Sequence, residues 1–88
     1  MRQEVIKFSE VMQYKLDKNA HKDGWPTKDA YGERSWNKAP MEFLLLKLQE
    51  EYAEFITAVR KESPENAKYE GADLANLAMM IVDRLGAL

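Results

Sequence analysis

The 88-residue chain has no cysteine and a single histidine, His21. The lack of cysteine excludes a disulfide framework and a thiolate metal site. A lone histidine in a loop excludes the Glu-x-x-His pairs of ferritin-type di-iron bundles. Neither sign of charge dominates, because 13 Lys and Arg stand against 15 Asp and Glu. General nucleic-acid binders and membrane-surface binders carry a basic excess, so we expect neither nucleic acid nor a membrane as partner.

Long apolar runs are also missing. The longest uncharged, mainly apolar run is residues 74–82, whereas a helix that spans a bilayer needs about 20 such residues. Residues 1–4 are not followed by the apolar core of a signal peptide. These features predict a cytoplasmic protein, and the length predicts a single domain over residues 1–88.

What the sequence does contain is helical periodicity. Apolar residues recur at three- and four-residue steps within residues 2–19, which predicts an amphipathic helix. Residues 19–40 show no period and hold two glycines and two prolines, so we expect a long loop, which in a compact domain is usually functional or disordered. Pro40 suits the first turn of a second helix, and residues 41–59 carry a bundle-type apolar stripe.

A second helix boundary lies in the segment KESPEN. Ser63 suits a helix N-cap and Pro64 the first helical position, so a third helix is expected from residue 64 to residue 85, before Gly86. The predicted fold is therefore all-α: an N-terminal helix, a long loop and an antiparallel helical hairpin.

Two acidic pairs interrupt the hairpin helices, Glu51 with Glu54 and Glu70 with Asp73. Residues three apart share a helical face, and both cross-pairs have position 62 as their midpoint, within the turn. An antiparallel hairpin thus brings the four carboxylates together, roughly 12–16 Å from the turn at 1.5 Å per residue. Such a cluster needs a counter-charge, and oxygen ligands suit Mg²⁺ or Mn²⁺ better than Zn²⁺ or Cu²⁺. The alternative is a pair of solvated acidic helix faces.

The same residues resemble a known signature. Glu50-Glu51-x-x-Glu54 followed by Glu70-x-x-Asp73 resembles the EExxE…ExxD motif of MazG-like nucleoside triphosphate pyrophosphohydrolases. The segment ADLANLAMMIVD is similar to the ADVANFAMMIAD ending of small, often phage-encoded members. The loop KNAHKDGW is similar to their KN..KGGW stretch, with Asp23 in place of a glycine.

The resemblance implies a function. It implies an all-α enzyme that hydrolyses (deoxy)nucleoside triphosphates to the monophosphate and pyrophosphate, with a role in nucleotide-pool house-cleaning. It further implies Mg²⁺ as cofactor, with Mn²⁺ able to substitute. Glu50 would orient or deprotonate the attacking water, and the metal ligands would be Glu51, Glu54, Glu70 and Asp73. Two other functions stay open: a phosphohydrolase that releases single phosphates, and a non-enzymatic helical interaction module.

Six further residues are candidates for substrate binding: Asn76, Lys18, His21, Lys22, Trp25 and Arg84. Each also has a structural interpretation. Asn76 follows Asp73 on one helix face and could equally satisfy a buried helix contact. The basic residues could complement helix C-termini. Trp25 could stack on a base or fill the space beneath the loop.

Residues 74–82 are apolar nearly all round the helix. A helix of that kind must be buried on more than one side, which a three-helix chain cannot achieve alone. We therefore expect a homodimer that completes a four-helix bundle, or a dimer of dimers.

Overall fold

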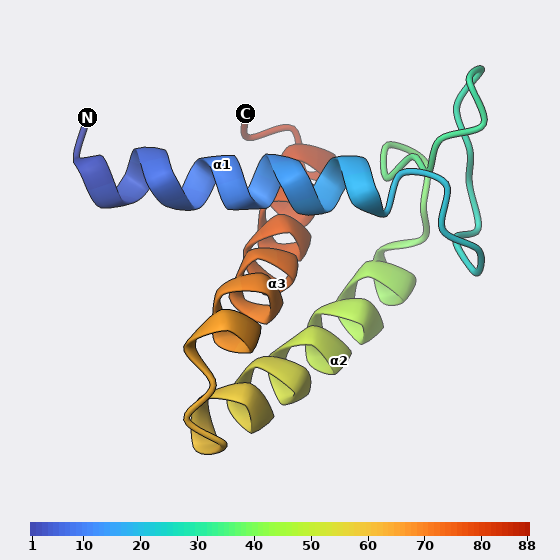
Figure 1. Ribbon diagram of the computed structural model, residues 1–88. Coiled ribbons are helices and arrows are strands. Elements are labelled where there is room, and N and C mark those ends of the chain that lie inside the picture. The colour runs from blue at the N-terminus through green and yellow to red at the C-terminus, as the bar shows by residue number, and fades with distance from the viewer.

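The computed structural model describes residues 1–88 and contains three helices and no strand: α1 (Gln3–Lys18), α2 (Met41–Arg60) and α3 (Pro64–Arg84). Figure 1 shows α2 and α3 as an antiparallel hairpin, with α1 lying across α3. The predicted all-α fold is confirmed, and the predicted helix ends lie within one or two residues of those observed. None of the helices combines the length and apolarity that crossing a membrane requires.

The turn between α2 and α3 has the predicted chemistry. The Ser63 hydroxyl oxygen accepts a hydrogen bond from the backbone N–H of Asn66 at 3.4 Å, and Pro64 opens α3. Glu62 has a positive φ of 53°, which lets the chain reverse within the three residues between α2 and α3. The turn is therefore tight enough to set the register of the two helices.

Close packing of α2 on α3 is possible because residue 71 has no side chain. A Cβ atom at Gly71 would lie only 3.1 Å from Cε1 of Phe55. These two residues follow Glu70 and Glu54 directly in the sequence. The close contact between Phe55 and Gly71 thus lies at the level of the acidic pairs.

Helix α1 is held on α3 by a buried amide. Asn76 is 1% exposed, and its Nδ2 donates a hydrogen bond to the backbone oxygen of Met12 at 3.0 Å. The Phe8 ring also reaches Gly71, with Cζ 3.7 Å from the position of a Cβ there. Together these contacts fix which residues of α1 face the hairpin.

The core lies where the loop returns to the open end of the hairpin. It consists of Ala39, Leu44, Leu77 and Met80, with both tryptophans packed against it. The Trp36 Nε1–H donates to Oδ2 of Asp83 at 2.8 Å, which ties the end of the loop to α3.

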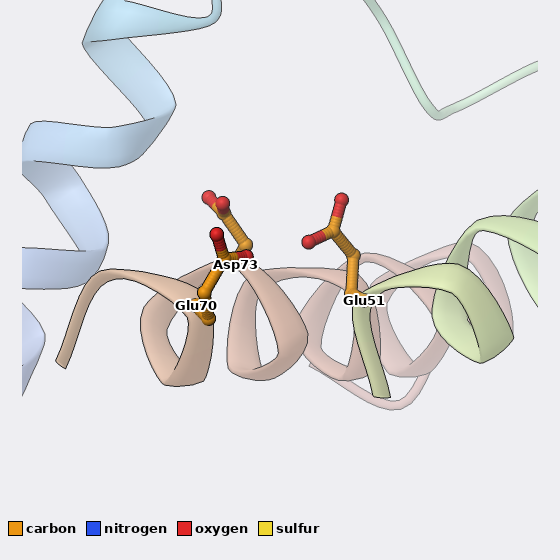
Figure 2. Close-up of side chains that lie close together, drawn as sticks. All are labelled: Glu51, Glu70 and Asp73. Atoms are coloured by element: carbon orange, nitrogen blue, oxygen red, sulfur yellow. The ribbon is translucent and has the colours of Figure 1, made fainter. Parts of the chain in front are cut away.

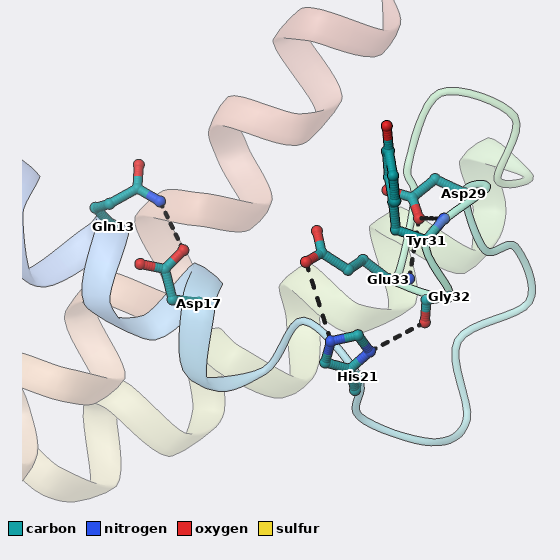
Figure 3. Close-up of polar contacts among 7 residues, drawn as sticks. All are labelled: Gln13, Asp17, His21, Asp29, Tyr31, Gly32 and Glu33. Carbon is teal, nitrogen blue, oxygen red and sulfur yellow. Dashed lines mark hydrogen bonds and ion pairs between the residues drawn. The ribbon is translucent and has the colours of Figure 1, made fainter.

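Residues 19–40 form neither helix nor strand, yet they are tied together by polar contacts. Asp29 Oδ1 accepts hydrogen bonds from the backbone N–H groups of Tyr31 and Glu33 at 2.8 and 3.0 Å. His21 Nδ1 lies 3.2 Å from the Gly32 carbonyl oxygen, and its Nε2 lies 4.0 Å from a Glu33 carboxylate oxygen (Figure 3). The loop is thus folded back on itself at the end of α1.

Candidate metal centre

Three carboxylates meet between the two hairpin helices. One oxygen each of Glu51, Glu70 and Asp73 lies within 4.8 Å of the other two. Figure 2 shows Glu51 reaching from α2 toward the two acids on α3. All three side chains are partly buried. The structure therefore brings together three of the four acids that the hairpin register predicted.

The protein environment disfavours the charged form of all three. Burial, followed by the charges of Asp73, Glu54 and Glu70, raises the pKa of Glu51 to about 7. Burial and the neighbouring acids also raise the pKa of Glu70. The pKa of Asp73 is raised by burial, although nearby cations partly oppose that shift. The three groups thus repel one another, and a positive charge beside them would favour their ionised forms.

Part of that charge comes from Lys15 on α1. Its Nζ lies 3.4 Å from Oδ2 of Asp73, and the two side chains are only 14% and 15% exposed. Sequence reasoning missed this residue. A signal was available, because Lys15 lies three residues after Met12 and seven after Phe8, on the otherwise apolar side of α1. A lysine there needs an anionic partner on the helix that it faces.

The other two acids of the motif lie at the edge of this cluster. Glu54 is exposed, but its charge raises the pKa of both Glu51 and Glu70, which places it beside them. Glu50 is exposed and pairs with Lys47, Nζ to Oε2, at 3.2 Å. Glu54 therefore lies at the solvent-exposed edge of the cluster, and Glu50 lies on the neighbouring surface of α2.

A pocket opens next to the cluster, between the loop and α2. Its wall includes Lys22, Trp25, Arg34 and Glu51. The first two were predicted substrate residues. Arg34 was not predicted, and the aperiodic loop sequence held no signal that would have placed it near the acids. Its positive charge opposes the upward shift in the Asp73 pKa, as does that of Lys22.

The remaining predicted substrate residues do not line this pocket. His21 contacts the loop, and Lys18 Nζ lies 6.0 Å from the centroid of the Tyr14 ring. Asn76 holds α1. Arg84 is exposed in the last turn of α3, about 16 Å along the helix from Asp73 at 1.5 Å per residue.

The residues of the cluster fit a divalent cation. Glu51 Oε2 and Glu70 Oε2 are buried and have no hydrogen-bond partner, a state that buried carboxylate oxygens rarely keep. Only one lysine is paired with the three carboxylates. An ion with oxygen ligands would satisfy the two oxygens and balance the charge together. We therefore call Glu51, Glu70 and Asp73 the acidic triad.

Comparison with known proteins identifies the family of the chain. Residues 25–86, more than half of the chain, match the model of the phosphoribosyl-ATP pyrophosphohydrolase family. The chain belongs to that family, which is part of the MazG-like all-α NTP pyrophosphatase superfamily. Its members are hydrolases that act on phosphoric anhydride bonds. Searches of curated proteins and of solved structures gave no match.

The acidic triad predicts an unusual dependence of stability on pH. In EDTA, the free energy of unfolding should decrease as the pH rises from about 4.5 to about 7, because folded Glu51 binds its proton more tightly than unfolded Glu51 does. The stabilisation is complete below that window and lost above it. In Glu51→Gln the decrease should be smaller, and the variant should be more stable than the wild type at pH 8.

Urea unfolding at a series of pH values would measure this effect. Glu65→Gln is the matched control, since Glu65 is an exposed acid in the first turn of α3, paired with Lys68. The control should follow the wild type. Identical pH profiles for Glu51→Gln and the wild type would contradict the raised pKa.

Proposed function

We propose that the chain hydrolyses a nucleoside triphosphate between its α- and β-phosphates and releases the monophosphate and pyrophosphate. The observation that carries this proposal is the acidic triad, with two buried oxygens that lack partners. Membership of a pyrophosphohydrolase family supports cleavage between the α- and β-phosphates, which releases pyrophosphate. The resemblance of the acidic motif to MazG-like enzymes favours ordinary (deoxy)nucleoside triphosphates, and hence a role in nucleotide-pool house-cleaning.

A second candidate substrate is phosphoribosyl-ATP, because the matching family carries that name. Both candidates present the same reacting group, a triphosphate. They differ in the second sugar phosphate, which only phosphoribosyl-ATP carries. The two proposals therefore share the reaction and differ only in the group recognised around the base.

We propose that the metal is Mg²⁺ and that Mn²⁺ can substitute for it. Its ligands would be the three carboxylates of the acidic triad and, as a fourth, Glu54. When bound, such an ion supplies positive charge to the phosphate oxygens and to the departing pyrophosphate. Lys15 keeps Asp73 oriented from α1. Burial of the triad lowers the local dielectric and so strengthens the attraction between these carboxylates and a cation.

Glu50 is the proposed base. It directly precedes Glu51 but lies on the exposed side of α2, where a water molecule can reach it. Its pairing with Lys47, which lines the same pocket as Glu51, holds the carboxylate near that pocket. From there it can orient the attacking water and accept its proton.

We assign substrate contact first to Lys22 on the pocket wall; Trp25 lies on the same wall, and its stacking on a base stays a prediction. Lys22 offers a cation to a phosphate oxygen. For Lys18, His21, Asn76 and Arg84 a role in substrate binding stays a prediction, and the observed contacts of His21 and Asn76 give both a structural role as well.

We also propose that two copies pair through the hairpin. Leu45, Tyr52 and Val59 recur every seven residues along α2 and are 36%, 58% and 48% exposed. Leu48, Tyr52 and Leu74 line an open apolar hollow that joins α2 to α3. A symmetric partner would cover this apolar face with its own copy of the same face and complete a four-helix bundle.

Removal of one triad carboxylate should abolish turnover. Glu51→Gln or Glu70→Gln should reduce kcat/KM by more than the roughly 10- to 100-fold that loss of an outer-sphere partner costs, with helical content unchanged by circular dichroism. Glu65→Gln should retain wild-type activity. The assay should screen (deoxy)nucleoside triphosphates and phosphoribosyl-ATP with Mg²⁺ and quantify pyrophosphate and monophosphate.

Each alternative function gives a different result in that assay. Equal amounts of pyrophosphate and monophosphate support the proposal. Orthophosphate as the first product would instead indicate a phosphohydrolase that removes single phosphates. An absence of turnover on every substrate would favour the interaction module.

Charge placed in the apolar face should separate the subunits. The wild type is expected to sediment with two or four times the 10.2 kDa mass of one chain. Tyr52→Lys should shift it to the monomer, because an unpaired buried charge opposes association by several kcal/mol. Tyr31→Lys is the control, since Tyr31 is 85% exposed in the loop. A wild-type protein that sediments as a monomer at micromolar concentration would contradict the proposal.

A further inference from the structure

Arg34 is a half-buried cation that forms no ion pair within the chain. None of the four ion pairs involves it: Lys15–Asp73, His21–Glu33, Lys47–Glu50 and Lys68–Glu65. Its guanidinium lies over the ring of Trp25, with Cζ 4.8 Å from the centroid. Burial lowers the pKa of Arg34, and the nearby charges of Asp73 and Glu51 oppose that change. A guanidinium with five donors in such a place is suited to an anion from outside.

The position of Arg34 is fixed by its surroundings. Its backbone N–H donates to the carbonyl oxygen of Ala20 at 2.6 Å, which anchors it at the end of α1. The Trp25 indole beneath it donates from Nε1 to the Ser35 carbonyl oxygen at 2.8 Å. The same indole meets the ring of Phe43 edge-on, 4.9 Å between centroids. The guanidinium therefore rests on an aromatic ring that is itself held on two sides.

The pocket around Arg34 is lined by charged side chains of both signs. Arg34 shares the wall of a pocket with two lysines, Lys22 and Lys47, and with two acids, Asp23 and Glu51. Lys47 is also paired with Glu50 on the neighbouring surface, so Arg34 and Lys22 are the two cations of the wall without an ion pair. A polyphosphate in this pocket would meet three cationic side chains while one of its phosphates reached the triad. Singly charged or uncharged ligands would gain much less from the same wall.

We propose that this pocket binds the pyrophosphate portion of the substrate, and that Arg34 contacts its non-bridging oxygens through two parallel N–H···O hydrogen bonds. Planar, two-point recognition of phosphate is what a guanidinium does better than an ammonium group. The inference rests on the proposed function, because it takes a triphosphate as the substrate. Beyond that function, it assigns recognition of the pyrophosphate portion to a loop residue, Arg34.

Trp25 then acts as a positioning residue. One face of its ring carries the Arg34 guanidinium, so the ring contributes to binding by holding that group in place. The sequence predicted a different role, direct stacking of Trp25 on the base. In that role Trp25 would contribute to substrate binding independently of Arg34. The two roles therefore predict different Michaelis constants for the triphosphate in a double variant.

Calorimetric titration with inorganic pyrophosphate at constant Mg²⁺ tests the site without turnover. Arg34→Met should weaken pyrophosphate binding about 10- to 150-fold, the range expected for hydrogen bonds to a charged group. Arg34→Lys, which keeps the charge, should lose about fivefold or more because it loses the two-point contact. Arg60→Met is the control, as Arg60 is an exposed arginine at the end of α2, and it should bind as the wild type does.

Adenosine monophosphate should bind Arg34→Met and the wild type equally well, because it lacks the pyrophosphate portion. Unchanged melting temperatures would show that the variants are folded. A pyrophosphate Kd for Arg34→Met within twofold of the wild-type value would overturn the proposal. Since this readout involves no hydrolysis, a protein that binds pyrophosphate through Arg34 but cleaves no triphosphate would refute the proposed function alone.

A double-variant cycle tests the role of Trp25. If Trp25 acts through Arg34, then Trp25→Leu combined with Arg34→Met should bind pyrophosphate no more weakly than Arg34→Met does. The Michaelis constant for a triphosphate should follow the same pattern. Base stacking predicts a further increase in the Michaelis constant of the double variant, and an additive loss in either measurement would overturn the positioning role of Trp25.

Discussion

The central physical constraint on the hairpin is the mutual repulsion of three carboxylates that its packing holds close together. Glu51, Glu70 and Asp73 approach within 4.8 Å in a partly buried space, and burial together with their neighbours raises the pKa of Glu51 to about 7. Packing at this level is nonetheless close, because Gly71 admits the Phe55 ring. The packing holds the acids together, and their mutual repulsion would be relieved by a cation bound between them.

The rest of the chain brings cations toward the triad from two directions. Helix α1, held by Asn76, delivers Lys15 to Asp73 at 3.4 Å. The loop, folded back at the end of α1, places Arg34 and Lys22 on the pocket wall beside Glu51. One cation is paired with a triad carboxylate, whereas Arg34 has no ionic partner. This division suits a site in which a metal binds the acids and an anionic substrate binds the remaining cations.

The three helices, the turn at Ser63–Pro64 and the meeting of the acidic pairs could all be predicted from the sequence, because periodicity and a shared midpoint fix the register of a hairpin. The crossing of α1 could not, since it depends on a hydrogen bond between Asn76 and a backbone oxygen 64 residues away. Arg34 was missed for a related reason. Its place is set by stacking on Trp25 and by a bond to Ala20, and an aperiodic loop carries no pattern that predicts such contacts.

The most direct test of the account is whether the acidic triad binds a divalent cation in the folded chain. Electron paramagnetic resonance of Mn²⁺ distinguishes free from bound ion without any substrate. The account predicts that the wild-type protein removes the free Mn²⁺ signal, that added Mg²⁺ restores it by competition, and that Glu70→Gln binds far more weakly while Glu65→Gln behaves as the wild type. Equal Mn²⁺ binding by Glu70→Gln and the wild type, or no binding by either, would contradict it.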